Sequence, residues 1–88
     1  MTTTDDLMRE AMTGAGFQRL ADSPVLGLER WNTTPEAWRR GGPDCRMTRY
    51  RAGWRISAIA GGSGRRVPCT SPEELVEMMA EMKPRPWR

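Results

Sequence analysis

Residues 46–70 read RMTRYRAGWRISAIAGGSGRRVPCT, a stretch in which short runs of strand-forming residues are separated by glycine. Gly53 and the glycine cluster at 61–64 divide it into two or three runs, and this spacing is typical of a β-meander. The stretch is also basic and includes the aromatic residues Tyr50 and Trp54. It therefore predicts the central part of an antiparallel sheet.

The middle run predicts a strand with one apolar face. Side chains alternate across a strand, so Trp54 and Ile56 point to the same side and Arg55 points to the other. We expect the first side to enter the core and the second to face water. Ile59 interrupts the alternation, which leaves two interpretations open: a central strand partly covered on its second face, or a strand that ends near Ala58.

The glycine cluster at 61–64, followed by Arg65 and Arg66, has the composition of an anion-binding loop. A P-loop, however, needs the spacing Gly-x-x-x-x-Gly-Lys-Ser/Thr at the start of a helix, and here a strand follows. We therefore interpret the cluster as a charged hairpin loop. Because Pro68 has no backbone N–H to donate, the run after the loop indicates an edge strand, or one that leaves the sheet at Val67.

A helix is predicted to begin directly after this stretch. Ser71 is placed as N-cap, Pro72 as the first helical residue and Glu74 as the third, which together make a capping box. An apolar stripe at helical spacing follows, formed by Leu75, Met78, Met79 and Met82. Pro84 ends the helix one residue after Lys83, and the stripe predicts that the helix packs across the sheet.

The first residues predict another helix. Thr3 or Thr4 can cap it, and Gly14 with Gly16 can end it. We expect one face to be formed by Leu7, Met8, Ala11, Met12 and Ala15. The helix would precede the sheet in the chain and pack on the same core.

Two strand candidates lie between this helix and the central stretch. Residues 17–21 form a possible short strand, and residues 25–32 form the next. In the second, Leu26 and Leu28 share one face and Trp31 belongs to the other. Which of these faces is inside stays open at this point.

Thr34 and Pro35 repeat the start signal seen at Ser71 and predict a short inserted helix, which the glycines and proline at 41–43 end. Its Trp38 either covers one end of the core as a lid or forms an exposed contact, and packing is the commoner role for a tryptophan in a small domain. The last residues, 83–88, alternate proline with basic residues and predict an extended tail.

These elements predict one small α+β domain over residues 1–88. It contains an antiparallel sheet of three to four strands, an N-terminal helix, a short inserted helix and a C-terminal helix packed on one face. No apolar run approaches membrane-spanning length and no secretory leader is visible, so we expect a cytoplasmic protein without membrane contact.

The residue types present argue against a catalytic or metal site. The chain contains no histidine, and its two cysteines, Cys45 and Cys69, are not in a Cys-x-x-Cys motif. This excludes the ordinary zinc motifs and histidine-based catalysis. Two reduced, buried thiols are favoured over a disulfide. We therefore expect a protein that is not an enzyme and takes no cofactor.

Positive charge is concentrated in the middle of the chain. Residues 37–72 carry eight arginines and one acidic residue, although the net charge of the whole chain is only +3. The candidate partner-binding residues are Arg46, Arg49, Tyr50, Arg51, Arg55, Arg65, Arg66, Trp38, Arg39 and Arg40. Arginine with aromatic residues suits protein interfaces and nucleic acids, and a solvated strand face remains the simplest alternative.

In length, and in carrying no recognisable motif, the chain resembles small phage and mobile-element proteins, including inhibitors of bacterial defence such as anti-CRISPR proteins. The likeness is one of size and style, and no diagnostic residue carries it. It implies a non-enzymatic inhibitor that docks on an acidic surface of a larger protein or nucleoprotein complex. The alternative is a small nucleic-acid-binding accessory domain. A DNA mimic is disfavoured, because it needs a large negative field.

Overall fold

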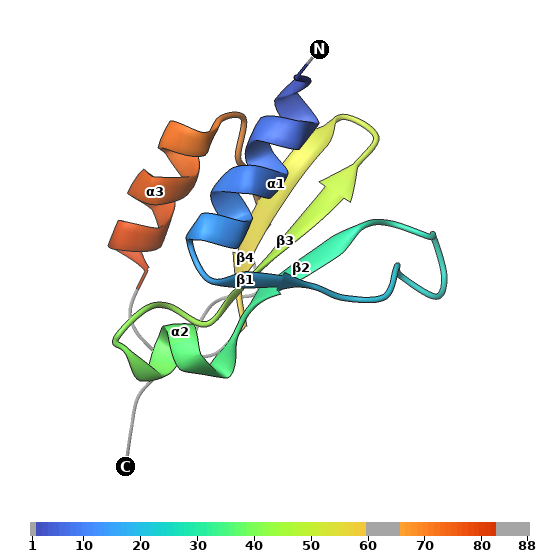
Figure 1. Ribbon diagram of the computed structural model, residues 1–88. Coiled ribbons are helices and arrows are strands. Elements are labelled where there is room, and N and C mark those ends of the chain that lie inside the picture. Colours follow the sequence, from blue (N-terminus) through green and yellow to red (C-terminus); the bar gives the residue numbers. More distant parts are fainter. Residues whose placement is uncertain (1, 60–65, 83–88) are drawn as a thin grey trace.

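The computed structural model describes residues 2–59 and 66–82, which form a two-layer α+β domain (Figure 1). The elements, in chain order, are α1 (Thr4–Gly14), β1 (Phe17–Arg19), β2 (Arg30–Thr33), α2 (Pro35–Arg39), β3 (Cys45–Tyr50), β4 (Gly53–Ala58), β5 (Val67–Pro68) and α3 (Pro72–Glu81). Figure 1 shows α1 and α3 next to each other on one side of the sheet, with α2 at one end. Within residues 2–59 and 66–82, no helix lies over the other side of the sheet.

The sheet is an antiparallel meander in the order β1-β2-β3-β4-β5. The α+β class is confirmed, but the sheet has five strands where three to four were predicted. The difference lies at the edges, where β1 has three residues and β5 only two. Such short strands carry little pattern of their own and form by pairing with a longer neighbour. Pro68 is on the edge strand, as expected.

The central hairpin has the predicted alternation. Trp54 and Ile56 are buried, and their partners across the pair are Arg49 and Met47. The strand β4 ends at Ala58, and Ile59 is exposed. The interruption of the pattern therefore marks the end of a strand, the second of the two interpretations.

The core lies between the two helices and the sheet. Its buried members are Met8, Met12, Phe17, Trp31, Cys45, Met47, Trp54, Ile56, Cys69 and Leu75. The stripe on α3 is confirmed, with Leu75 fully buried and its three methionines packed against the core. On α1 the prediction is wrong for Leu7, which is exposed. Leu7 is one residue, about 100°, away from Met8 around the helix, and the narrow buried face follows Met8 and Met12.

Each helix is capped by a hydroxyl side chain. Thr3 accepts from Asp6 N at 3.1 Å, and the Asp6 carboxylate accepts in return from Thr3 N at 3.3 Å. Ser71 accepts from Glu74 N at 3.2 Å, as predicted. The second hydrogen bond of the predicted capping box differs, because the Glu74 carboxylate accepts from the backbone N–H of Thr70 at 3.1 Å and not from that of the N-cap residue Ser71. Glu74 thus joins the end of β5 to the start of α3.

The segment between β1 and β2 departs most from expectation. A strand was predicted over residues 25–32, whereas β2 begins at Arg30 and Val25 and Leu26 sit in an exposed turn. Trp31 decides which side is inside, because it is buried opposite Met47 in the register. The apolar residues Val25, Leu26 and Leu28 therefore lie in the loop before β2 and not in the sheet.

The inserted helix α2 forms where predicted, with Thr34 as N-cap and Pro35 in the first turn. Trp38, however, does not close the core: it is half-buried, lies outside the core cluster and lines a cavity with Asn32, Asp44 and neighbouring residues. The predicted extended tail, residues 83–88, lies outside the described residues. No helix in the described ranges is long and apolar enough to span a bilayer.

Candidate binding surface

The face of the sheet that no described helix covers, which we call the open face, carries four of the described arginines. Alternation places these residues opposite the core side chains of each strand. The open face is formed by Arg30, Asn32, Arg46, Thr48, Tyr50, Arg55 and Ser57, with Arg66 just before β5. Four of the candidate partner-binding residues, Arg46, Tyr50, Arg55 and Arg66, share this face with Arg30, which sequence reasoning missed. Arg65 lies outside the described residues.

Tyr50 is at the centre of the basic cluster. The guanidinium of Arg55 lies 5.8 Å from the centre of the Tyr50 ring, and that of Arg66 lies 5.9 Å from it. Cation–π attraction holds guanidinium groups at such distances without removing their charge. The two arginines, from β4 and from the residue before β5, are thus brought to one place by a side chain of β3.

The other two open-face arginines are oriented by neutral acceptors. Arg46 Nε donates to Asn32 Oδ1 at 2.8 Å, and Arg30 donates through Nε and Nη2 to the Ala21 carbonyl at 3.1 and 2.9 Å. Neither bond neutralises the guanidinium. Both groups are therefore positioned and still carry their full charge.

Ion pairs are segregated to the opposite side of the sheet. Within residues 2–59 and 66–82, every ion pair involves Arg9, Arg19 or Arg49, and none involves an open-face arginine. Asp44 is buried at the α2 end of the sheet. The open face is consequently a positive surface without internal compensation among the described residues.

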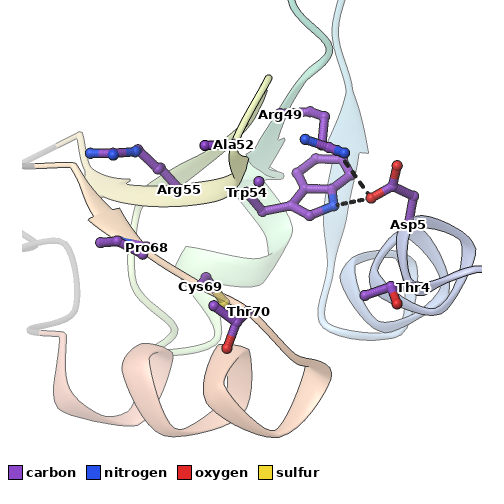
Figure 2. A pocket seen from close by; sticks show the side chains of 10 residues that line it. Thr4, Asp5, Arg49, Ala52, Trp54, Arg55, Pro68, Cys69 and Thr70 are labelled. Atoms are coloured by element: carbon purple, nitrogen blue, oxygen red, sulfur yellow. Dashed lines mark hydrogen bonds and ion pairs between the residues drawn. The ribbon is translucent and has the colours of Figure 1, made fainter.

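Arg49 belongs to the helix side, unlike the other predicted arginines of β3 and β4. Its Nε donates to Asp5 Oδ1 at 3.0 Å, and the same oxygen accepts from Trp54 Nε1 at 3.0 Å. Figure 2 shows both bonds converging on Asp5, with Arg55 pointing away from them. This triad lines a cavity of about 330 Å3 at the end of the hairpin. Its carboxylate is already satisfied, so we assign the triad to joining α1 to the sheet.

A second triad of the same composition joins α1 to β2. The Glu29 carboxylate accepts from Arg9 Nε and Nη2, both at 2.9 Å, and from Trp31 Nε1 at 2.7 Å. The hydrogen bonds from Arg9 hold the pKa of the Glu29 carboxyl below its ordinary value, although burial opposes the effect. Each triad satisfies the indole N–H of a buried tryptophan and fixes an arginine on the helix side.

Glu29→Gln is expected to reduce both stability and its pH dependence. A carboxyl whose pKa is depressed in the folded state stabilises the fold above its unfolded-state pKa, and the contribution disappears as the pH falls through the folded-state value. Wild type should thus lose stability between pH 7 and about pH 3, and the variant should lose less. At pH 7 we expect the variant to be about 1 to 3 kcal/mol less stable. Urea unfolding at both pH values measures this.

The comparison isolates Glu29, because the remaining carboxylates titrate in both proteins. Asp6 is among them, since hydrogen bonds from Thr3 lower its pKa. Equal loss of stability in the two proteins on acidification would show that the Glu29 triad does not stabilise the fold through its charge.

The other predicted site residues are spread around the ends of the sheet. Arg51 is exposed in the turn between β3 and β4. Trp38, Arg39 and Arg40 lie in and just after α2, where the Arg39 guanidinium is 5.7 Å from the Trp38 ring centre. The structure does not bring these residues into the Tyr50 cluster.

Sequence reasoning also missed the loop that borders the open face. A pocket of about 200 Å3 lies between this loop and the sheet. It is lined by Ser23, Leu26, Leu28, Arg30, Arg46, Thr48, Tyr50, Ser57 and Arg66. The available signal was the pair of apolar residues at 25–26 between proline and glycine, where turns are usually polar.

The thiols are unsuited to nucleophilic chemistry. Both cysteines are buried and unpaired, as predicted. Burial, with a smaller effect of Asp44, raises the pKa of Cys45 to about 12, and burial likewise raises the pKa of Cys69 to about 11. Both are therefore protonated at neutral pH, whereas the thiolate is the reactive form. No cluster of potential metal ligands occurs in the described part of the chain.

Comparison with known proteins adds no relative. No protein-family model matches the chain, and no significant match is found among curated proteins or solved structures. The geometry and charge of the open face are therefore the basis for inferring a function.

Proposed function

We propose that this chain is a non-enzymatic binding protein that docks the open face of its sheet on an acidic surface of a larger protein or nucleoprotein complex. The observation that carries the proposal is the segregation of arginines. Those of the helix side have carboxylate partners, whereas Arg30, Arg46, Arg55 and Arg66 have none among the described residues. An acidic partner would supply the missing carboxylates.

The chemistry of these side chains supports a protein partner. Arginine presents a planar fork that binds carboxylates through two parallel hydrogen bonds, and it is less strongly hydrated than lysine. Charge complementarity of this kind accelerates association and selects the partner. Occlusion of a surface needs no catalytic group, in keeping with the protonated state of the two thiols. The proposed role is thus inhibition by covering a surface, in the manner of the small phage and mobile-element proteins that the chain resembles in size.

One observation also favours nucleic acid as an alternative partner. Tyr50 lies on a strand of an open sheet among arginines, an arrangement that can stack on bases and contact phosphates. The Tyr50 ring is, however, already approached by the guanidinium groups of Arg55 and Arg66. A base would have to displace them, so we place the protein partner first.

The variant R46E/R55E is expected to lose the partner, because two attractive charges become repulsive at the centre of the contact. We expect the dissociation constant to rise at least tenfold, equivalent to about 1.4 kcal/mol or more. The measurement has two stages. Affinity capture from a bacterial lysate identifies the protein retained by wild type, and calorimetry with that purified protein gives the affinity of each variant.

The matched control is R40E/R51E, which changes net charge by the same amount at exposed positions outside the open face. It should retain the partner with nearly unchanged affinity. If the two double variants bind equally well, the open face is not the docking surface. If instead wild type shifts duplex or single-stranded DNA with an affinity that falls steeply between low and moderate salt, and R46E/R55E does not, the nucleic-acid alternative takes the lead.

A further inference from the structure

The loop between β1 and β2 forms a projection closed by backbone hydrogen bonds, which we call the finger (residues 23–28). Ser23 N donates to the Leu28 carbonyl at 2.8 Å, and Gly27 N donates to the Ser23 carbonyl at 2.7 Å. Gly27 has φ +66, a conformation that glycine adopts without strain. Figure 1 shows this loop extending away from α1 and α3. These internal hydrogen bonds favour this shape of the finger in the free protein.

The tip of the finger is apolar and exposed. Val25 is 86% exposed and Leu26 is 71% exposed. Single exposed apolar residues are ordinary, but an adjacent pair at the tip of a hydrogen-bonded turn is unusual, since such positions favour polar residues. Each would gain free energy by leaving water, and the internal hydrogen bonds of the finger reduce the entropy lost on binding.

The finger and the open face enclose one pocket. Leu26 and Leu28 provide its apolar side, and Arg30, Arg46 and Arg66 provide guanidinium groups. The hydroxyls of Thr48, Tyr50 and Ser57 also line it. With a volume of about 200 Å3, the pocket is of side-chain size and combines anion-binding groups with an apolar wall.

We infer that this pocket receives an acidic side chain of a protein partner while Val25 and Leu26 insert into an apolar hollow beside it. The inference rests on the proposed function and adds the nature of the partner surface. Phosphates of a nucleic acid would satisfy the arginines but offer no apolar hollow for the finger tip. Protein surfaces do combine an acidic group with an apolar hollow, because interface hot spots are apolar anchors surrounded by polar contacts.

A random dodecapeptide display library, selected on the immobilised full chain, tests this inference. We expect the enriched peptides to combine aspartate or glutamate with a bulky apolar residue. In fluorescence anisotropy with the synthesised peptides, V25S/L26S should raise the dissociation constant about tenfold or more, with little dependence on salt. R46E/R55E should raise it as well, with a loss that depends strongly on salt.

The control for the finger is Val76→Ser, which removes an apolar side chain that is 65% exposed on α3, on the other side of the molecule. It should leave the dissociation constant unchanged. Circular dichroism verifies that all variants fold, which matters most for Arg46, because it is half-buried whereas the other substituted positions are exposed.

The possible results separate the two proposals. Acidic peptides whose binding is weakened by R46E/R55E but not by V25S/L26S would overturn the role of the finger and leave the proposed function standing. Three results would overturn both the proposed function and the role of the finger. They are enriched peptides without acidic residues, peptides that bind R46E/R55E as well as wild type, and the absence of any enriched peptide. Weakening by Val76→Ser equal to that by V25S/L26S would show a non-specific apolar effect and also overturn the role of the finger.

Discussion

Trp54→Ala is expected to lower the free energy of unfolding by about 3 to 5 kcal/mol, the largest effect that we predict for a single substitution. The side chain is buried in the core, and its removal leaves a cavity between β4 and α1. The indole N–H bond to Asp5 is lost as well. A domain of this size has a total stability of roughly 4 to 13 kcal/mol. Much of the variant should therefore be unfolded at physiological temperature.

Two further substitutions distinguish the loss of buried apolar volume from the loss of the hydrogen bond to Asp5. Trp54→Phe keeps most of the apolar volume but removes the hydrogen bond to Asp5, and should lose about 1 to 2 kcal/mol. Trp38→Ala removes the same type of side chain from a half-buried position outside the core, and should lose about 1 kcal/mol. Urea denaturation followed by circular dichroism gives all three values. A loss below about 1 kcal/mol for Trp54→Ala would contradict its position in the core.

Gly16→Ala is expected to destabilise the protein by about 2 to 4 kcal/mol, although glycine-to-alanine changes are often favourable. Gly16 has φ +90, where a side chain is strained. A Cβ atom would lie 2.9 Å from Ala37 Cβ in α2. In addition, the Gly16 carbonyl accepts from Thr34 N at 2.9 Å, so the backbone there cannot shift without loosening the N-cap of α2. Thermal and urea unfolding measure the effect.

Gly14→Ala is the matched control, two residues earlier. Gly14 is the last residue of α1, and nothing lies within 4 Å of a Cβ built there. The substitution should be neutral or stabilise by up to about 1 kcal/mol, because alanine favours the helix. In the Gly16→Ala background, Ala37→Gly should recover part of the lost stability by relieving the contact. Additive effects of Gly16→Ala and Ala37→Gly would exclude that contact as the cause.

Much of the fold could be predicted because its signals are local. The caps at Thr3, Thr34 and Ser71 and the stripe on α3 depend on residues within about two turns of each other. The alternation around Trp54 likewise depends on its neighbours in one strand. Local patterns indicated an edge strand at Pro68 but could not give the total number of strands, since edge strands as short as β1 and β5 form only by pairing with a neighbour. They also could not determine which side of residues 25–32 is buried.

The candidate surface was predicted less completely than the fold. The sequence pointed to the arginines of the central hairpin, and Arg46, Arg55 and Arg66 do share the open face with Tyr50. Arg49 lies on the other side of the sheet. Arg30 and the finger were missed, because they precede the basic stretch and join it only through the pairing of β2 with β3.

By itself, the sequence determined the helix starts, the apolar faces of α3 and β4, and the excess of arginine in the middle of the chain. Each of these depends on residue type and short-range spacing. Only the tertiary structure decided which arginines are neutralised, because ion pairing depends on distance in space: Asp5 meets Arg49 across 44 positions, and Glu29 meets Arg9 across 20. Among the described residues, the same long-range pairing leaves the arginines around Tyr50 without carboxylate partners and places them beside the finger.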